Sequence, residues 1–151
     1  MEAHHAGVGL HARLQRLIQT RVWKMDIHPT ARIAPSAHID RTWPRGVHIG
    51  AHVEIGEQAV VLTHDFTRGL RGDTWIGARC RIGPRAIIMP AIVVGEDCII
   101  DPGALVNRDV PPNSIATGNP VSIEARNLQE ALEAGPADAG GDPQRRREVQ
   151  A

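Results

Sequence analysis

The chain has 151 residues, and its 17 basic and 17 acidic side chains cancel. A balanced charge excludes the basic surface that tracks a nucleic acid, and it gives no reason to expect attraction to an anionic membrane. No apolar run approaches the roughly 20 residues that cross a bilayer, and the N-terminal residues lack the apolar region of a secretory signal. We therefore expect a cytoplasmic protein without membrane insertion.

Cysteine and aromatic usage narrow the type of core. Cys80 and Cys98 are too few for a disulfide framework, and no Cys or His spacing matches a structural zinc site. One Phe, three Trp and no Tyr is a low aromatic content for a chain that must bury a core. The core is therefore expected to be narrow and aliphatic, with both cysteines as ordinary members.

An amphipathic helix is predicted over residues 10–22, within an N-terminal lead-in that ends at residue 26. Leu10, Leu14, Leu17 and Ile18 fall on one side of it at helical spacing. We expect this apolar side to cap the first turn of the domain that follows.

A six-residue repeat fills residues 27–120. The hexads IHPTAR, IAPSAH and IDRTWP start at Ile27, and IGAHVE, IGEQAV and VLTHDF start at Ile49. IGARCR, IGPRAI, IMPAIV, VGEDCI, IDPGAL and VNRDVP follow from Ile76. The first position is always aliphatic and the fifth is small or apolar, Trp43 included, until Asp65. Positions one and five are therefore expected to face one interior.

Six residues provide a short strand and a bend, so three hexads close a triangle. The sequence predicts an all-β fold, a left-handed parallel β-helix in the form of a triangular prism of about four coils. Coils stack at about 4.8 Å, which places Cys80 under Cys98 and Ala86 under Ala104. Glycine at position two and proline at position three are expected to form bends that need unusual or fixed backbone angles.

One excursion, DFTRGLRGDT at residues 65–74, interrupts the repeat, and residues 45–48 shift its phase. Counting back from Ile88 by one coil and the length of the excursion gives Val61, so Val61 and Ile88 are expected to stack in successive coils. His64 then falls at an outward corner beneath Ala91. Histidine exchanges a proton near neutral pH, so His64 is the candidate general base. Asp65 either orients its ring or starts the loop, and we favour the loop. The other repeat histidines are expected to be solvated: His28, His38, His48 and His52.

The C-terminal part reads as a helix over residues 121–134, starting at about Ser122 and stopped by Gly135. Residues 135–151 have the composition of a disordered tail.

The hexads resemble those of the hexapeptide-repeat acyltransferases. The stretch from Ile27 to Pro120 is similar to the branch that holds maltose, galactoside, nodulation-factor and exopolysaccharide O-acetyltransferases. LTHDFTRGLRGDTWIG and DVPPNSIATGNP carry the likeness most specifically, and MDIHPTARI and RGVHIG resemble the polysaccharide-linked members.

The resemblance implies an enzyme that transfers an acetyl group from acetyl-CoA to a hydroxyl of a sugar or glycan precursor, without a metal. It implies a homotrimer with active sites between neighbouring prisms and His64 as the general base. Cofactor contacts carried over from the family are Gly83, Ala104, Asn107, Arg108, Gly118, Asn119 and Pro120. Acceptor contacts are expected from Asp65, Thr67, Arg68 and Arg71.

Several residues depart from the family pattern. Ala91 stands where glycine is common, Asp101 and Pro102 stand where small residues are usual, and Val121 and Ser122 replace an alanine and a basic residue. These differences predict a weaker or differently posed cofactor site, with Arg126 as the candidate replacement for the lost positive charge.

Two other functions are compatible with the repeat. A zinc enzyme of the gamma-class carbonic anhydrase type shares the prism, and His28 and His64 are 36 residues apart, but position 69 is glycine and the remaining histidine of that family is missing. A non-catalytic β-helix with a structural or assembly role is the third reading. The residues leave open whether the acceptor is a hydroxyl or an amine.

Overall fold

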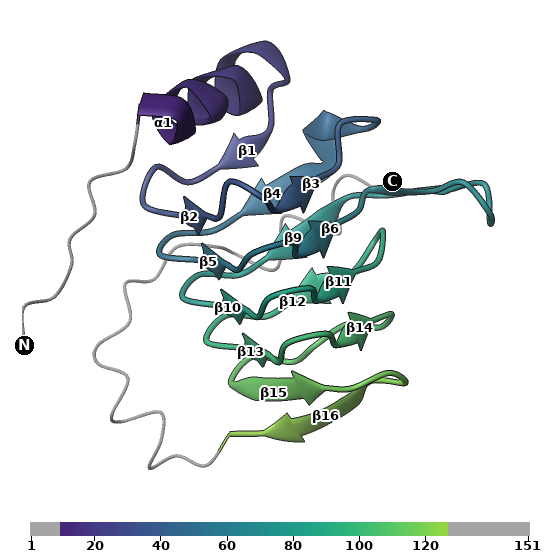
Figure 1. The fold of residues 1–151 in the computed structure, drawn as a ribbon. Coiled ribbons are helices and arrows are strands. Elements are labelled where there is room, and N and C mark those ends of the chain that lie inside the picture. The colour runs from purple at the N-terminus through teal and green to yellow at the C-terminus, as the bar shows by residue number, and fades with distance from the viewer. Residues whose placement is uncertain (1–9, 127–151) are drawn as a thin grey trace, which may run out of the picture.

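The structure, a computed structural model, describes residues 10–126 and shows a stack of parallel coils with three flat sides (Figure 1). Sheet A contains β1 (Asp26–Ile27), β4 (Val47–Ile49), β9 (Thr74–Ile76) and β12 (Val93–Val94). Sheet B contains β2 (Arg32–Ile33), β5 (Glu54–Ile55), β10 (Arg81–Ile82), β13 (Ile99–Ile100), β15 (Ser114–Thr117) and β16 (Ser122–Ala125). Sheet C contains β3 (His38–Ile39), β6 (Val60–Val61), β11 (Ile87–Ile88) and β14 (Leu105–Val106).

The predicted left-handed parallel β-helix is confirmed. Strand pairing follows the hexad count, since Arg81 pairs with Ile99 and places Cys80 under Cys98. Ile88 pairs with Val61 across the excursion, as counting predicted. The protein is thus one prism, whose interior is built by a period that can be read from the sequence.

The core is aliphatic and follows positions one and five of the hexads. From Ile76 onward every such residue is buried: Ile76, Cys80, Ile82, Ala86, Ile88, Ile92, Val94, Cys98, Ile100, Ala104, Val106 and Val110. Trp43 was expected in this core and is instead half-buried, so that prediction was wrong. The chain leaves the coil there in a 3-10 turn, Pro44–Gly46, which carries the indole outside the interior.

Glycine at position two of the hexads serves close approach of neighbouring coils rather than unusual backbone angles. A Cβ on Gly77 would lie 2.6 Å from the backbone nitrogen of Glu96 in the next coil. The left-handed angles occur instead at position four, where most residues are not glycine: His52, Gln58, Arg79, Arg85, Ala91, Asp97 and Gly103. The sequence-based expectation therefore assigned the strained bend to the wrong position of the hexad.

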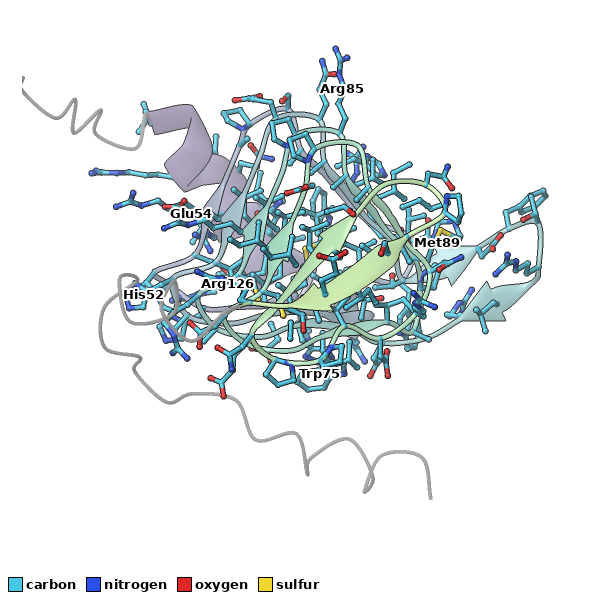
Figure 2. The ribbon with its side chains drawn as sticks, turned by 90° about the horizontal axis from the view of Figure 1, so that it is seen from below. His52, Glu54, Trp75, Arg85, Met89 and Arg126 are labelled. Carbon is cyan, nitrogen blue, oxygen red and sulfur yellow. The ribbon has the colours of Figure 1, made fainter. Side chains whose placement is uncertain are left out.

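The excursion at residues 65–74 is a β-hairpin that projects from one corner of the prism. Its strands are β7 (His64–Asp65) and β8 (Leu70–Arg71), paired antiparallel with His64 opposite Arg71. The backbone N–H of Gly72 donates to the carbonyl of Thr63 at 2.9 Å and closes its base. Seen along the stack, the hairpin leaves beside the corner that holds Met89 (Figure 2).

The N-terminal segment forms helix α1 (Leu10–Leu17) and a π-helical turn (Ile18–Val22). The expected capping by its leucines was wrong, because Leu10, Leu14 and Leu17 are exposed. The helix contacts the first coil through Arg16, which donates to the carbonyls of His28 and Ala31, because backbone acceptors at the open end of the stack attract a cation. No helix within residues 10–126 is long and apolar enough to span a bilayer.

The predicted C-terminal helix was wrong at its start. Ser122–Ala125 form β16, which pairs antiparallel with β15 at the last coil. An unpaired strand edge at the end of the stack offers hydrogen bonds that outweigh the local helical preference. The rest of that predicted helix and the predicted tail at 135–151 lie outside the described residues.

Substituting Gly77 by Ala tests the close approach of coils. We expect a loss of about 2–3 kcal/mol in the free energy of unfolding, because backbone atoms must move apart across the stack. Gly103→Ala is the matched control, since its Cβ would meet nothing within 4 Å and its φ is 73°. It should cost about 1 kcal/mol, so equal losses in urea denaturation would contradict the close-approach explanation.

Candidate active site

His64 lies at the corner between sheets C and A, where the chain leaves β6 for the hairpin. Its side chain is 31% exposed, so one edge of the imidazole is reachable from solvent. The other edge faces Asp40, a carboxylate that is only 1% exposed. The ring is therefore held on the buried side and free on the outer side.

Asp40 is the acceptor at the centre of this corner. Its Oδ2 accepts from the backbone N–H groups of Thr63 at 2.9 Å and His64 at 3.1 Å, and from Nδ1 of the His64 ring. Its Oδ1 accepts from the N–H of Thr42 at 2.8 Å. A carboxylate only accepts, so Nδ1 carries the ring proton and Nε2 keeps its lone pair for the outside.

The ionised form of Asp40 is stabilised in the native state. Burial raises the pKa of this carboxyl, but hydrogen bonds from Thr63, His64 and Thr42 together hold the pKa well below its usual range. The carboxylate stays charged throughout the neutral range, so it can support a positive charge on the imidazole when Nε2 takes up a proton.

Asp65, Thr67 and Arg68 are tied to one another in the hairpin. Oδ1 of Asp65 accepts from the Thr67 hydroxyl at 2.6 Å and from the N–H groups of Thr67 and Arg68 at 2.9 and 3.2 Å. The Thr67 hydroxyl is the main cause of the lowered pKa of Asp65, although burial opposes it. Asp65 thus shapes the turn, and Asp40 orients the His64 ring.

Arg71 stands across the hairpin from His64, and cross-strand partners project to one face. Its guanidinium lies 5.2 Å from the centre of the Trp43 ring, whose Nε1 donates to Asp73 Oδ1 at 3.2 Å. The Thr63 hydroxyl lies 2.9 Å from the carbonyl of Trp43, which ties this loop to the base of the hairpin. The arrangement holds one cation on the same face of the hairpin as the imidazole.

Asp40 is the residue of the candidate site that the sequence analysis missed. It occupies position two of its hexad, where Gly or small residues are common, and it stands five residues before the start of the phase shift at residues 45–48. Ile39 pairs with Val61, so Asp40 lies beside the residues that lead into His64. The sequence signal that could have found it is an acidic residue next to a core position, which falls beside the His64 segment once the phase shift is included in the count of residues per coil.

The residues predicted to bind the cofactor lie at two different edges of the prism. Gly83 and the turn 118–120 lie at the corner between sheets B and C, where the carbonyl of Gly118 accepts from Leu105 at 3.0 Å. Asn107 and Arg108 are exposed at the corner that also holds His64, two coils further along. The Ala104 side chain is fully buried, so only its backbone could contact a ligand.

Arg126 does not replace the missing positive charge at the turn 118–120, so that suggestion was wrong. Its Nη1 donates to the carbonyl of Asp97 at 3.0 Å, at the corner between sheets A and B. Figure 2 shows it on the same side of the prism as His52 and away from Arg85, which marks the corner between sheets B and C. Arg108 is partly engaged as well, since it donates to the carbonyl of Val121 at 3.2 Å.

An open groove of about 460 Å³ runs across the outer face of sheet B. Gly83, Asp101 and Pro102 line it at one edge, and the exposed side chains of Arg32 and Arg81 also line it. Two of the residues that depart from the family pattern, Asp101 and Pro102, therefore border this groove. Its position places a full side of the prism, sheet C, between the groove and His64.

The remaining repeat histidines differ in their surroundings. His28, His38 and His52 are exposed, as expected for solvated residues. The expectation was wrong for His48, which is 16% exposed and stacks on Trp75 with ring centres 3.6 Å apart. Within residues 10–126 no group of three or more His, Cys, Asp or Glu side chains could hold a metal ion.

The repeat and its corner histidine can be compared with known proteins. Residues 73–108 match the family described as bacterial transferase hexapeptide (six repeats). The repeat of this chain is thus similar to the hexapeptide repeats of bacterial transferases.

Sequence relatives of this chain include YvoF of Bacillus subtilis, 29% identical over 97 residues, which are 62% of this chain and 56% of the relative. A serine acetyltransferase of Mycobacterium tuberculosis is 34% identical over 105 residues, which are 66% of this chain and 44% of the relative. The chain therefore spans about half the length of these curated relatives.

Solved structures share the fold. A hexapeptide-repeat-containing acetyltransferase from Vibrio cholerae has a TM-score of 0.60 at 19% identity, over 78% of this chain and 82% of that one. A galactoside acetyltransferase in complex with coenzyme A has a TM-score of 0.58 at 19% identity, over 86% of this chain and 76% of that one. At such identities the likeness concerns the prism itself.

Replacing Asp40 by Asn tests the buried acceptor. An amide has a single oxygen, so its NH2 group must face donors that now meet Oδ1 or Oδ2, and we expect a loss of about 1–3 kcal/mol in the free energy of unfolding at neutral pH. Because the native pKa of Asp40 is lowered, its stabilising effect is complete above about pH 4 and is lost as the pH falls below that value. The difference between wild type and variant should shrink over the same range.

Thermal or urea unfolding at several pH values measures this difference. Asp65→Asn is the control, because its carboxylate lies in the hairpin and should leave the stability of the prism unchanged. A difference between wild type and Asp40→Asn that stays constant from neutral to acid pH would contradict the assignment.

Proposed function

We propose that this protein moves an acetyl group from acetyl-CoA to a hydroxyl of a sugar or glycan precursor. One observation carries the proposal: Asp40 fixes the His64 ring at the base of the hairpin with Nε2 turned outward. The relatives include serine acetyltransferases, and one solved neighbour is a galactoside acetyltransferase in complex with coenzyme A. Both support transfer from a CoA thioester.

His64 acts as the general base. Its Nε2 takes the proton from the acceptor hydroxyl while the oxygen attacks the thioester carbonyl carbon, and Asp40 balances the charge that forms on the imidazole. The tetrahedral intermediate expels the CoA sulfur as the C–S bond breaks. The proton on Nε2 then passes to the thiolate, so the products are the acetyl ester and free CoA.

Acetyl-CoA is assigned to a groove between copies of the chain in a homotrimer. Sheet C separates the edge that holds Gly83 and Gly118 from the edge that holds His64. A cofactor that runs along the first edge would therefore reach His64 of a neighbouring copy more readily than His64 of its own copy. Val60, Ile87 and Leu105 form an apolar row on the outer face of sheet C. Such a row suits a repeated subunit contact.

The acceptor carries an anionic group that Arg71 binds. Trp43 holds the guanidinium on the same face of the hairpin as His64, where it can pair with a carboxylate or phosphate on the substrate. An acidic sugar or a phosphate-linked glycan precursor meets this requirement, and a neutral sugar would leave the cation unused.

The His64→Ala variant tests the base. We expect kcat for transfer to fall about 10²- to 10⁴-fold while the prism remains folded, because the imidazole lies on the outside of the stack. Release of the CoA thiol with a panel of sugar acceptors measures the rate. His52→Ala is the matched control, since His52 is exposed and Ala91 already occupies the same hexad position with the same left-handed φ.

Unchanged turnover in His64→Ala would falsify the assignment. Metal analysis that finds one zinc per chain in the active protein would favour a metal-dependent reaction instead.

The Arg71→Gln variant tests the acceptor subsite. We expect the KM for an anionic acceptor to rise about tenfold or more, with little change in kcat or in the KM for acetyl-CoA, because a charge-assisted hydrogen bond is lost from binding alone. Arg45→Gln, at another exposed basic position, is the control. If both variants keep the wild-type KM, Arg71 does not bind the acceptor.

A further inference from the structure

Helix α1 presents an apolar stripe that no part of residues 10–126 covers. Leu10, Leu14 and Leu17 follow helical spacing and are 84%, 55% and 53% exposed. Val22, just beyond, is 67% exposed. Large apolar side chains gathered on one exposed face of a helix mark an interaction surface, whereas single ones do not.

Basic residues accompany the stripe. Residues 1–25 carry four basic side chains and one acidic side chain, and no Asp or Glu stands between Ala3 and Met25. Arg16 is turned toward the first coil, but Arg13, Arg21 and Lys24 are exposed. The zero net charge of the whole chain therefore conceals a basic N-terminal segment and an acidic excess in the remainder.

We propose that α1 is a docking surface for a lipid bilayer with anionic headgroups. The leucine stripe would enter the boundary between headgroups and acyl chains, and Arg13, Arg21 and Lys24 would meet the lipid phosphates. Exposed leucines beside arginines and a lysine, with no carboxylate among them, are the composition of an interfacial helix. A second copy of this chain is a poorer occupant, because pairing α1 with itself would bring like charges together.

The position of α1 suits docking that leaves the candidate active site open. The helix lies at the end of the stack beside β1, whereas the hairpin leaves the prism from its side, between β6 and β9 (Figure 1). If the chain forms the trimer of the proposed function, cyclic symmetry places the three helices in one plane and adds their affinities. The lipid proposal itself does not depend on transferase activity.

Vesicle flotation with the full chain tests the proposal. The probes are vesicles of phosphatidylcholine alone and vesicles of phosphatidylcholine and phosphatidylglycerol at about two to one. We expect the wild-type chain to bind the anionic vesicles, and to bind them more weakly at high salt. Binding should be about tenfold weaker, or weaker still, in both Leu14→Ser/Leu17→Ser and Arg13→Gln/Arg21→Gln. Circular dichroism should show an unchanged prism, because all four side chains are exposed.

Matched controls separate this surface from other features. Phe66→Ser removes an apolar side chain that is 92% exposed on the hairpin, and Arg45→Gln removes a cation outside α1; both should bind like wild type. His64→Ala should also bind, which distinguishes a failure of this proposal from a failure of the proposed function.

Three outcomes would overturn the inference. The first is no binding to either vesicle, and the second is equal binding to both. The third is a leucine variant that keeps vesicle binding but changes its oligomeric state in light scattering, because this would assign the stripe to a protein contact.

Discussion

Direct backbone hydrogen bonding between successive coils is the constraint on which this structure depends. Each coil lies so close to the next that a Cβ on Gly77 would meet the neighbouring backbone. The same stacking leaves an interior wide enough only for aliphatic and small side chains, such as Cys80 and Cys98. A coil buries little by itself, so stability and regularity arise together from the stack. Any segment that departs from the period is therefore pushed to the outside.

The candidate active site uses this rigidity. Asp40 and His64 belong to successive coils, and backbone pairing of those coils fixes the distance between their side chains. The carboxylate is already desolvated and surrounded by N–H donors, so little has to reorganise when the imidazole gains charge. The hairpin adds Arg71 on the same side as the base. A regular scaffold thus holds the proposed general base, and an irregular insertion holds the side chain proposed to bind the acceptor.

Two departures from the repeat carry the exposed apolar side chains of the described residues. The hairpin exposes Phe66 and Leu70, and the N-terminal segment exposes its leucines and Val22. Both lie outside the prism, where their side chains add nothing to the core. Their placement at a side and at an end of the same stack separates the surface proposed for chemistry from the surface proposed for docking.

The sequence by itself determined the prism, the strand register and the exposed corner of His64, because burial in a coil repeats with a local period of six residues. It did not determine the partner of His64. The phase shift at residues 45–48 changes the number of residues between the two coils, and only the stacked structure shows that Asp40 then lies beside His64. The displaced Trp43, the strand at Ser122–Ala125 and the uncovered face of α1 were likewise decided by the tertiary structure. Each depends on which backbone groups and surfaces are left open once the coils have stacked, and no local pattern of residues encodes that.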